Sequence, residues 1–407
     1  MPSEFHDVLT TELQAGLREL ESRSQRRTLA EVGGVNLCSN DYLGLAEYPA
    51  LKEAVLQAVD GAIRMGGTGS RLLSGHAAVW SELEEEFAEF AGSEAALYFG
   101  SGYAANIGLL TSLAGTNDVI FSDALNHASI IDGIRLSGAR KVIYPHRDTH
   151  ALETALKENQ NARGRKLIVT ETVFSMDGDI APVDEIVALA EKYGAGVIVD
   201  EAHATAVHGA GGRGIASHAL AAGKIVAAMH TCGKALGSAG AFVCGSAVLR
   251  DHLINHARTF IFSTATPPYM AAQIRAALHL AFTMDRERAE LISRAADFAK
   301  SLLREGWETM GSATQIVPAV IGENDAALTA AEYLQHSGFA VRAIRPPTVP
   351  QGTARLRFSL THKISATELA QLASALCAWR AQQQHATSHA TSHGTSQATP
   401  MTMAGTA

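Results

Sequence analysis

The sequence predicts an α/β protein in which a mostly parallel sheet is covered by helices on both faces. From residue 95 onward, short apolar runs typical of buried strands alternate with segments of helical periodicity. Parallel strands need a crossover connection, usually a helix, so this alternation is typical of a parallel sheet between two helical layers. Ligands of such sheets bind at the carboxyl ends of the strands.

Seven apolar runs are expected as strands of this sheet, at residues 95–99, 119–122, 141–144, 167–171, 196–200, 225–230 and 241–245. Most are joined by helical patterns, at residues 103–113, 129–137, 149–159 and 183–193. A long helical stretch at 268–304 follows, and two or three strands with two helices at 316–381 predict a small α+β domain.

We divide the chain into four parts. They are an N-terminal helix and arm (1–45), a large ligand-binding domain (46–285), a small C-terminal domain (286–381) and a disordered tail (382–407). The tail is expected to be disordered because it is rich in Ala, Thr, Ser, His and Gln and has no periodicity.

Composition excludes several classes of protein. The 407 residues carry a net charge of −8, which argues against binding nucleic acid or an anionic membrane through a basic face. The four scattered cysteines predict neither disulfides nor a metal site, and acidic residues in the N-terminal helix argue against a leader peptide. No apolar run approaches the ~18 residues of a membrane span. We therefore expect a cytoplasmic protein of enzyme size.

Two charged residues at strand ends carry most of the chemical information. Asp200 ends a buried strand, where an isolated Asp is also typical of a helix N-cap. Lys234 follows a later strand in an almost uncharged neighbourhood, where a loop lysine could also pair with a carboxylate. A desolvated lysine has a lowered pKa and can form a Schiff base with a carbonyl. Together, the Asp and the Lys match pyridoxal 5'-phosphate chemistry, in which Asp pairs with the pyridinium nitrogen.

Two further motifs fit that cofactor. The segment 99–103 joins a strand to a helix start through Gly100, Ser101 and Gly102, and free N–H groups at a helix start attract a phosphate. His127 also follows a strand, where it could stack on a planar ring or simply begin a helix.

These motifs, in this order and spacing, resemble the α-oxoamine synthase family of fold-type I pyridoxal phosphate enzymes. The resemblance covers nearly the whole chain except the tail. It also runs through the segments 39–44, 74–76, 172–179, 200–203 and 262–264.

The resemblance implies a role for each matched residue. Lys234 would form the Schiff base and move the α-proton, Asp200 would pair with the ring nitrogen, and His203 would bond the ring hydroxyl. His127 would stack on the ring, and Ser175 would support the ring hydroxyl or the substrate. The phosphate would be held by Ser101, Gly102, Tyr103 and Thr231, and by Ser263 and Thr264 of a neighbouring subunit in a homodimer with shared sites. Asn40 and Arg357 would bind the carboxylate of the amino acid, a guanidinium being suited to a carboxylate, and Arg345 would be a further substrate-binding residue.

The segments 343–350 and 352–357 are most similar to family members that join L-alanine to a pimeloyl thioester in biotin biosynthesis. The thioester would be pimeloyl-CoA or pimeloyl-acyl carrier protein. Sister activities remain open: glycine with acetyl-CoA or succinyl-CoA, or serine with a long acyl thioester. A non-catalytic partner subunit of the same fold is a further alternative, against which the presence of Lys234 argues. A dehydrogenase has little support, because the glycine-rich stretch 66–70 precedes the alternating region.

Overall fold

The computed structural model describes residues 4–31, 33–62 and 64–394, and for 386–394 only the backbone. Its central feature is a seven-stranded sheet with the strand order β2, β8, β7, β6, β5, β3, β4. The strands are β2 (Ala95–Phe99), β3 (Val119–Asp123), β4 (Arg140–Tyr144), β5 (Lys166–Glu171), β6 (Gly196–Asp200), β7 (Ala227–Thr231) and β8 (Ala241–Gly245). All seven expected strands are therefore present, with bounds shifted by at most two residues.

The sheet is mostly parallel, as the sequence predicts. Strands β3 to β7 pair in parallel, and β8 runs antiparallel to both of its neighbours, β2 and β7. Most of the central strands are buried along nearly their whole length, as in β6, where Val197, Ile198 and Val199 are at most 2% exposed. A strand covered on both faces is a continuous apolar run, which is the pattern its sequence shows.

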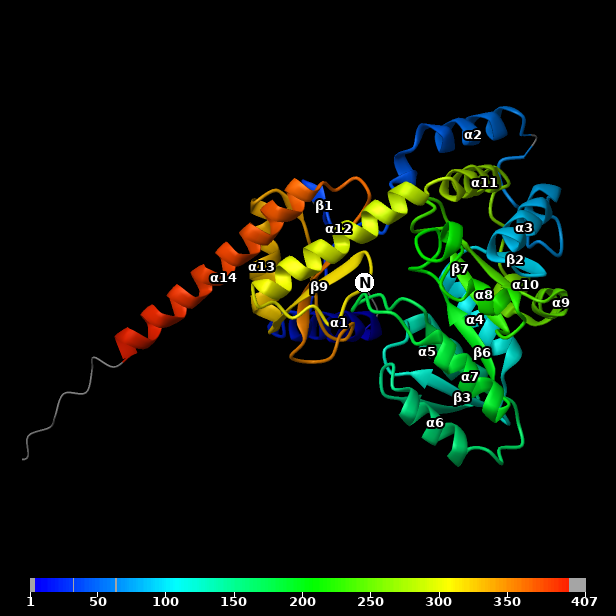
Figure 1. The fold of residues 1–407 in the computed structure, drawn as a ribbon, viewed down its shortest axis with the longest axis horizontal. Coiled ribbons are helices and arrows are strands. Elements are labelled where there is room, and N and C mark those ends of the chain that lie inside the picture. The colour runs from blue at the N-terminus through cyan, green and yellow to red at the C-terminus, as the bar shows by residue number, and fades with distance from the viewer. Residues whose placement is uncertain (1–3, 32, 63, 395–407) are drawn as a thin grey trace, which may run out of the picture.

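Helices cover this sheet and connect its strands (Figure 1). They are α3 (Ala78–Ala91), α4 (Gly102–Leu113), α5 (Ala128–Ser137), α6 (Thr149–Glu158), α7 (Val183–Tyr193), α8 (Ser217–Ala221), α9 (Ala247–His256) and α10 (Arg258–Ile261). Parallel pairing and the intervening helices bring the carboxyl ends of β3, β5, β6 and β7 to one edge, where the motif residues follow the strands.

A second, smaller sheet lies beside the large one. Strands β11 (Ala343–Ile344), β12 (Ala354–Ser359) and β9 (Ile316–Gly322) form an antiparallel sheet in that order, and β1 (Val35–Asn36) pairs in parallel with β10 (Phe339–Ala340). Helices α12 (Asp285–Arg304), α13 (Asn324–His336) and α14 (Ala366–Gly394) accompany these strands. This is the α+β arrangement expected of the C-terminal region.

Two expectations differ from the structure. The helical stretch expected at 268–304 is two helices, α11 (Tyr269–Phe282) and α12, because the backbone leaves the helix at Met284. The tail expected to be disordered from 382 begins inside α14, which continues to Gly394, since Ala and Gln are good helix formers. The rest of that tail, 395–407, lies outside the described residues. The division at residues 45, 285 and 381 stays a prediction.

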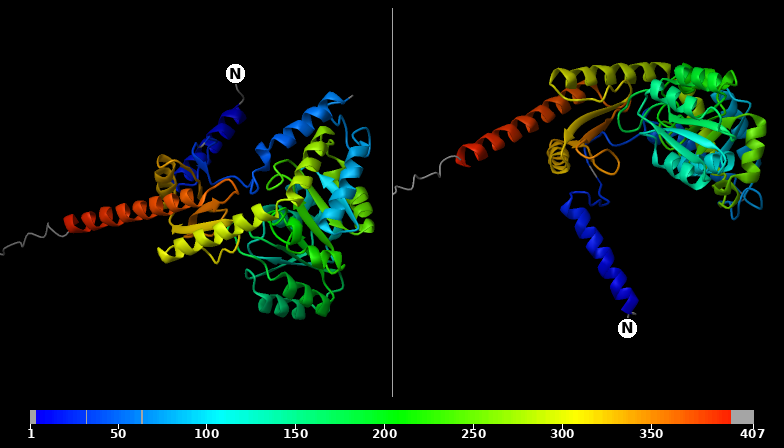
Figure 2. Two further views of the ribbon diagram at one scale, coloured as in Figure 1. Left: turned by 45° about the horizontal axis from the view of Figure 1, so that its top comes forward. Right: turned by 90° about the horizontal axis from the view of Figure 1, so that it is seen from below.

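The first helix, α1 (Glu4–Ser22), stands apart from the rest of the chain (Figure 2). Its apolar side chains, which include Phe5 and Leu13, are exposed. A 3₁₀ turn at Leu45–Glu47 and α2 (Pro49–Asp60) lead from this arm to the large sheet, where α2 packs against α11. None of the helices in the described residues has both the length and the apolar character needed to cross a bilayer.

Candidate active site

Asp200 lies at the carboxyl end of β6, buried and fixed by two hydrogen bonds. Its Oδ2 accepts from Nδ2 of Asn106 at 2.8 Å, and its Oδ1 accepts from the backbone N–H of Ala202, also at 2.8 Å. The neighbouring strand β5 ends in Glu171, which is paired in register with Asp200. Two carboxyl groups therefore lie side by side at this edge of the sheet.

Lys234 follows β7 and places its amine against His203. The distance from Nζ to Nε2 of that histidine is 2.8 Å. Burial lowers the pKa of Lys234 to about 8, although the nearby charges of Asp200 and Glu171 act in the opposite direction. Burial also holds the pKa of His203 well below its usual range, so the ring is neutral. The partner of this amine is thus a neutral ring rather than a carboxylate.

The second ring nitrogen of His203 begins a chain of hydrogen-bonded polar side chains. Since Lys234 donates to Nε2, the neutral ring carries its proton on Nδ1 and donates to Oη of Tyr42 at 2.6 Å. Tyr42 in turn donates to Oδ1 of Asn40 at 3.1 Å, and that oxygen also accepts from Nη2 of Arg357 at 3.2 Å. Nε of Arg357 donates to the carbonyl of Ser175 at 2.5 Å. The structure thus links Asn40, Ser175 and Arg357 to Lys234.

Ser101, Gly102 and Thr231 come together where β7 ends and α4 begins. Ser101 caps α4, its Oγ accepting from the N–H of Ala104 at 3.1 Å. A Cβ on Gly102 would lie 3.8 Å from Oγ1 of Thr231, so the first turn of α4 lies directly beside that hydroxyl. A helix start with small residues and a nearby hydroxyl is chemically suited to a phosphate.

His127 caps α5 and is joined to Asp200 through side chains. Its Nδ1 accepts from the N–H of Ser129 at 3.2 Å and lies 2.8 Å from the hydroxyl of that serine. The same hydroxyl accepts from Nδ2 of Asn106, the residue that binds Asp200. Burial lowers the pKa of His127, whereas the charge of Asp200 raises it.

Tyr103 is exposed and donates from its hydroxyl to Asp132, and its ring stands edge-on to that of His127 with the centroids 6.3 Å apart. The other three predicted site residues lie apart from this cluster. Ser263 and Thr264 are exposed on the segment between α10 and α11. Arg345 donates to the carbonyl of Ser24 and makes no hydrogen bond to Lys234 or Arg357 within the described chain.

Four residues of the cluster were not predicted as site residues: Tyr42, Asn106, Ser129 and Glu171. Glu171 carries the same signal as Asp200, a carboxylate at the end of a buried strand. It is 2% exposed, its Oε1 has no hydrogen-bond partner, and burial together with Asp200 raises its pKa well above the usual range. Asn106 gives no such signal, because it lies inside a helix.

One group of side chains has a spacing that could hold a metal ion. Ligand atoms of His146, Asp177 and Asp179 lie within 4.8 Å of one another. However, both ring nitrogens of His146 are bonded to carboxylates, and Asp177 is paired with Arg355. The ring nitrogens of His146, Oδ2 of Asp179 and Oδ1 of Asp177 are therefore engaged in ion pairs, whereas Oδ1 of Asp179 is buried without a hydrogen-bond partner.

Comparisons with known proteins agree with this geometry. The model of the family "Aminotransferase class I and II" matches residues 32–376. The 8-amino-7-oxononanoate synthase of Geobacter sulfurreducens is 48% identical over 90% of this chain and 98% of its own. A serine palmitoyltransferase structure from S. paucimobilis, with a bound PLP–myriocin aldimine, is similar with a TM-score of 0.83 and 28% identity over 90% of this chain and 96% of that one.

A structure of 8-amino-7-oxononanoate synthase from Francisella tularensis is also similar, with a TM-score of 0.73 and 28% identity over 86% of this chain and 99% of that one. The fold is that of the fold-type I pyridoxal phosphate enzymes. The chain belongs to the class I and II aminotransferase family. Within that family it belongs with the 8-amino-7-oxononanoate synthases.

Proposed function

We propose that this chain joins L-alanine to a pimeloyl thioester, releasing carbon dioxide and the free thiol and forming 8-amino-7-oxononanoate. The supporting observation is the 48% identity to a synthase of that name along nearly the whole chain. Biotin biosynthesis uses this product. The four cysteines are free thiols in the structure, which supports a cytoplasmic location.

Pyridoxal 5'-phosphate is the cofactor, and the residues present fit it. Asp200 would pair with the ring nitrogen, Lys234 would hold the aldehyde carbon, and the start of α4 with Thr231 would hold the phosphate. A desolvated amine whose partner is a neutral imidazole fits this assignment, because a neutral amine is the nucleophile that such attachment requires. When bound, the cofactor withdraws electrons from the breaking bonds at Cα of alanine.

The side chains supply orientation and proton transfer. Arg357 and Asn40 would bind the carboxylate of alanine, which places its Cα–H bond toward Lys234. With the cofactor bound, the free amine of Lys234 would remove the Cα proton of alanine. The carbanion attacks the thioester carbonyl, the thiol leaves, and loss of the carboxylate is followed by reprotonation at the same carbon. His127 would stack on the ring, and His203 would bond the ring hydroxyl.

The test is a panel of L-alanine, glycine and L-serine against acetyl, succinyl, pimeloyl and palmitoyl thioesters, with thiol release and product mass as readouts. The pimeloyl group is supplied both on CoA and on acyl carrier protein. We expect turnover with L-alanine and a pimeloyl thioester, and none in Lys234→Ala. Activity with glycine or serine alone would assign a sister reaction. A wild-type protein that binds pyridoxal phosphate without turnover on any pair would favour a non-catalytic subunit.

We further propose a homodimer in which Ser263 and Thr264 reach the phosphate in the partner's site. Supporting this, both residues are exposed, and the large apolar side chains Leu73 and Phe262 are 83% and 71% exposed on the isolated chain. The segments that carry them adjoin, since the N–H of Ala265 donates to the carbonyl of Gly69 at 2.9 Å, and contiguous exposed apolar area is typical of a protein–protein interface. Light scattering should give twice the chain mass, and Thr264→Ala should weaken cofactor binding. A monomer with full activity would refute the shared site.

A further inference from the structure

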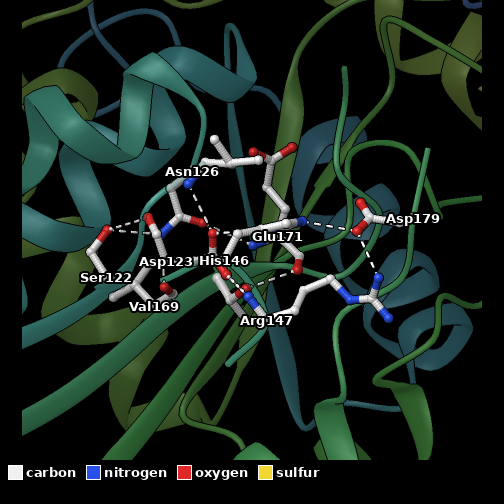
Figure 3. A network of polar contacts seen from close by, with 10 residues as sticks. Ser122, Asp123, Asn126, His146, Arg147, Val169, Glu171 and Asp179 are labelled. Atoms are coloured by element: carbon white, nitrogen blue, oxygen red, sulfur yellow. Dashed lines mark hydrogen bonds and ion pairs between the residues drawn. The ribbon is translucent and has the colours of Figure 1, made fainter. Parts of the chain in front are cut away.

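His146 lies between two carboxylates that come from different parts of the sheet edge. It follows β4, and its Nδ1 is 2.9 Å from Oδ1 of Asp123 at the end of β3. Its Nε2 is 2.8 Å from Oδ2 of Asp179, which lies beyond the end of β5 (Figure 3). An imidazole with an acceptor at both nitrogens carries a proton on each of them, so this ring is a cation.

Further contacts support the same arrangement. Nη1 of Arg147 donates to Asp179 at 2.8 Å, and its backbone N–H donates to Asp123 at 2.9 Å (Figure 3). The two carboxylates raise the pKa of His146 to about 9, against the opposing effect of burial. The ring of Phe174 stands at 90° to the imidazole with the centroids 4.3 Å apart. His146 is therefore held on three sides.

Asp179 belongs to a turn that carries Ser175. The turn is closed by an isolated antiparallel bridge between Val173 and Ile180 and by the hydrogen bond from N–H of Phe174 to the carbonyl of Asp179, at 3.0 Å. Gly178, with φ of +69°, makes the reversal possible. Asp179 anchors one end of this turn, and the carbonyl of Gly178 is held separately by the N–H of Ala313 at 3.0 Å and Oγ1 of Thr314 at 2.8 Å.

The turn makes two contacts with one face of β12. Asp177 pairs with Arg355, and the carbonyl of Ser175 accepts from Arg357. Residues two apart in a strand point to the same side, so both guanidinium groups face the turn. Arg357 is thus held by the turn through the carbonyl of Ser175 and by Oδ1 of Asn40, and the same turn contacts His146 through Asp179.

We propose that His146, through Asp179 and the turn 173–180, is a positioning residue for the Arg357 guanidinium. This assignment rests on the proposed role of Arg357 as the amino acid's carboxylate site. The three carboxylates of Asp123, Asp177 and Asp179 face three cationic groups, His146, Arg147 and Arg355. The charges therefore balance without a metal ion.

The test compares His146→Gln with wild type as holoenzymes. Gln keeps a polar side chain but cannot bridge both carboxylates as a cation. The dissociation constant of L-alanine is measured from the change in cofactor absorbance, which does not depend on condensation. We expect it to rise about 10-fold, equivalent to about one charge-assisted hydrogen bond. Steady-state assays should show a raised KM for alanine with an unchanged KM for the thioester.

His252→Gln is the matched control, because His252 is a partly buried histidine of α9 that bonds the carbonyl of Ser112. It should leave alanine binding unchanged. A His146→Gln enzyme with unchanged alanine affinity, or with a lower kcat alone, would overturn the positioning role. A metal ion at this group would overturn it as well. Its sign would be a melting temperature that falls on dialysis against EDTA for wild type but not for His146→Gln.

Failure of the proposed function is distinguishable from failure of this inference. If the wild-type holoenzyme binds glycine or serine in place of alanine, the dissociation constant of that amino acid is measured for His146→Gln and for wild type, and the ratio of the two is taken. A ratio near one then contradicts the positioning role, whatever the second substrate is.

Discussion

The hydroxyl oxygen of Tyr42 lies 2.6 Å from Nδ1 of His203, and the opposite ring nitrogen lies 2.8 Å from Nζ of Lys234. Tyr42 comes from the N-terminal arm, whereas His203 and Lys234 follow strands of the large sheet. This contact fixes the orientation of the histidine ring that faces the amine.

Tyr42→Phe should lower kcat/KM about 10-fold, because it leaves a buried N–H of His203 without an acceptor at a cost of about 1–3 kcal/mol. The melting temperature should fall as well. Tyr48→Phe removes the hydroxyl of a 43% exposed tyrosine and should change neither quantity. Wild-type kinetics in Tyr42→Phe would show that the ring is held by other contacts.

Asn106→Asp should weaken cofactor binding more than Asn106→Ala does. The alanine variant removes one hydrogen bond to Asp200, at a cost of about 1–3 kcal/mol for the buried acceptor. The aspartate variant adds a second negative charge at that position, which favours protonation of one of the two carboxyls. Titration of the apoenzyme with pyridoxal phosphate measures both dissociation constants. Equal constants would contradict the electrostatic account.

Reconstitution of the apoenzyme should speed up as the pH rises through about 8, the lowered pKa of Lys234. Only the neutral amine attacks the aldehyde. In the folded chain the neutral amine forms at a lower pH than in an ordinary lysine, whose pKa is 10.5. Stopped-flow absorbance with excess pyridoxal phosphate follows the rate. A midpoint near 10 would mean that burial does not perturb this amine, and Lys234→Ala controls for non-specific attachment.

Arg357→Lys should raise the KM for L-alanine by about 10- to 100-fold, since an ammonium group cannot make the two parallel bonds of a guanidinium with a carboxylate. The pimeloyl thioester KM should stay near the wild-type value. Arg342→Lys, at an arginine that donates to the carbonyl of Ala30, is the control. An equal rise in both KM values would argue that Arg357 acts on the fold rather than on alanine.

The stability of the fold should decrease as the pH rises through about 9. The folded state raises the pKa of His146 from 6.5 to about 9, so its contribution is fully present below 6.5 and is lost as the ring deprotonates. The groups around it are Asp123 and Asp179, with Arg147 beside them and the Asp177–Arg355 pair beyond. Melting temperatures between pH 7 and 10 should fall more steeply for wild type than for His146→Gln; parallel curves would contradict the assignment.

Local signals determined the strands and the residues that follow them. Buried parallel strands are continuous apolar runs, so β5, β6 and β7 were predictable, and Asp200 and Lys234 stood out as charges at their ends. The family resemblance added His203, Asn40 and Arg357. It also implied roles for Tyr103, whose ring stands edge-on to His127, and for Ser263, Thr264 and Arg345, which lie apart from the cluster in the isolated chain.

Only the tertiary structure decided which side chains meet. Tyr42 reaches His203 because the N-terminal arm lies against the sheet edge, and Asn106 reaches Asp200 because α4 packs there. His146 is a cation because two carboxylates, one at the end of β3 and one beyond the end of β5, converge on it. The sequence by itself determined the strand ends and their charges, since these depend on neighbours along the chain. The pairing of those groups depends on distances across the fold, which local patterns do not contain.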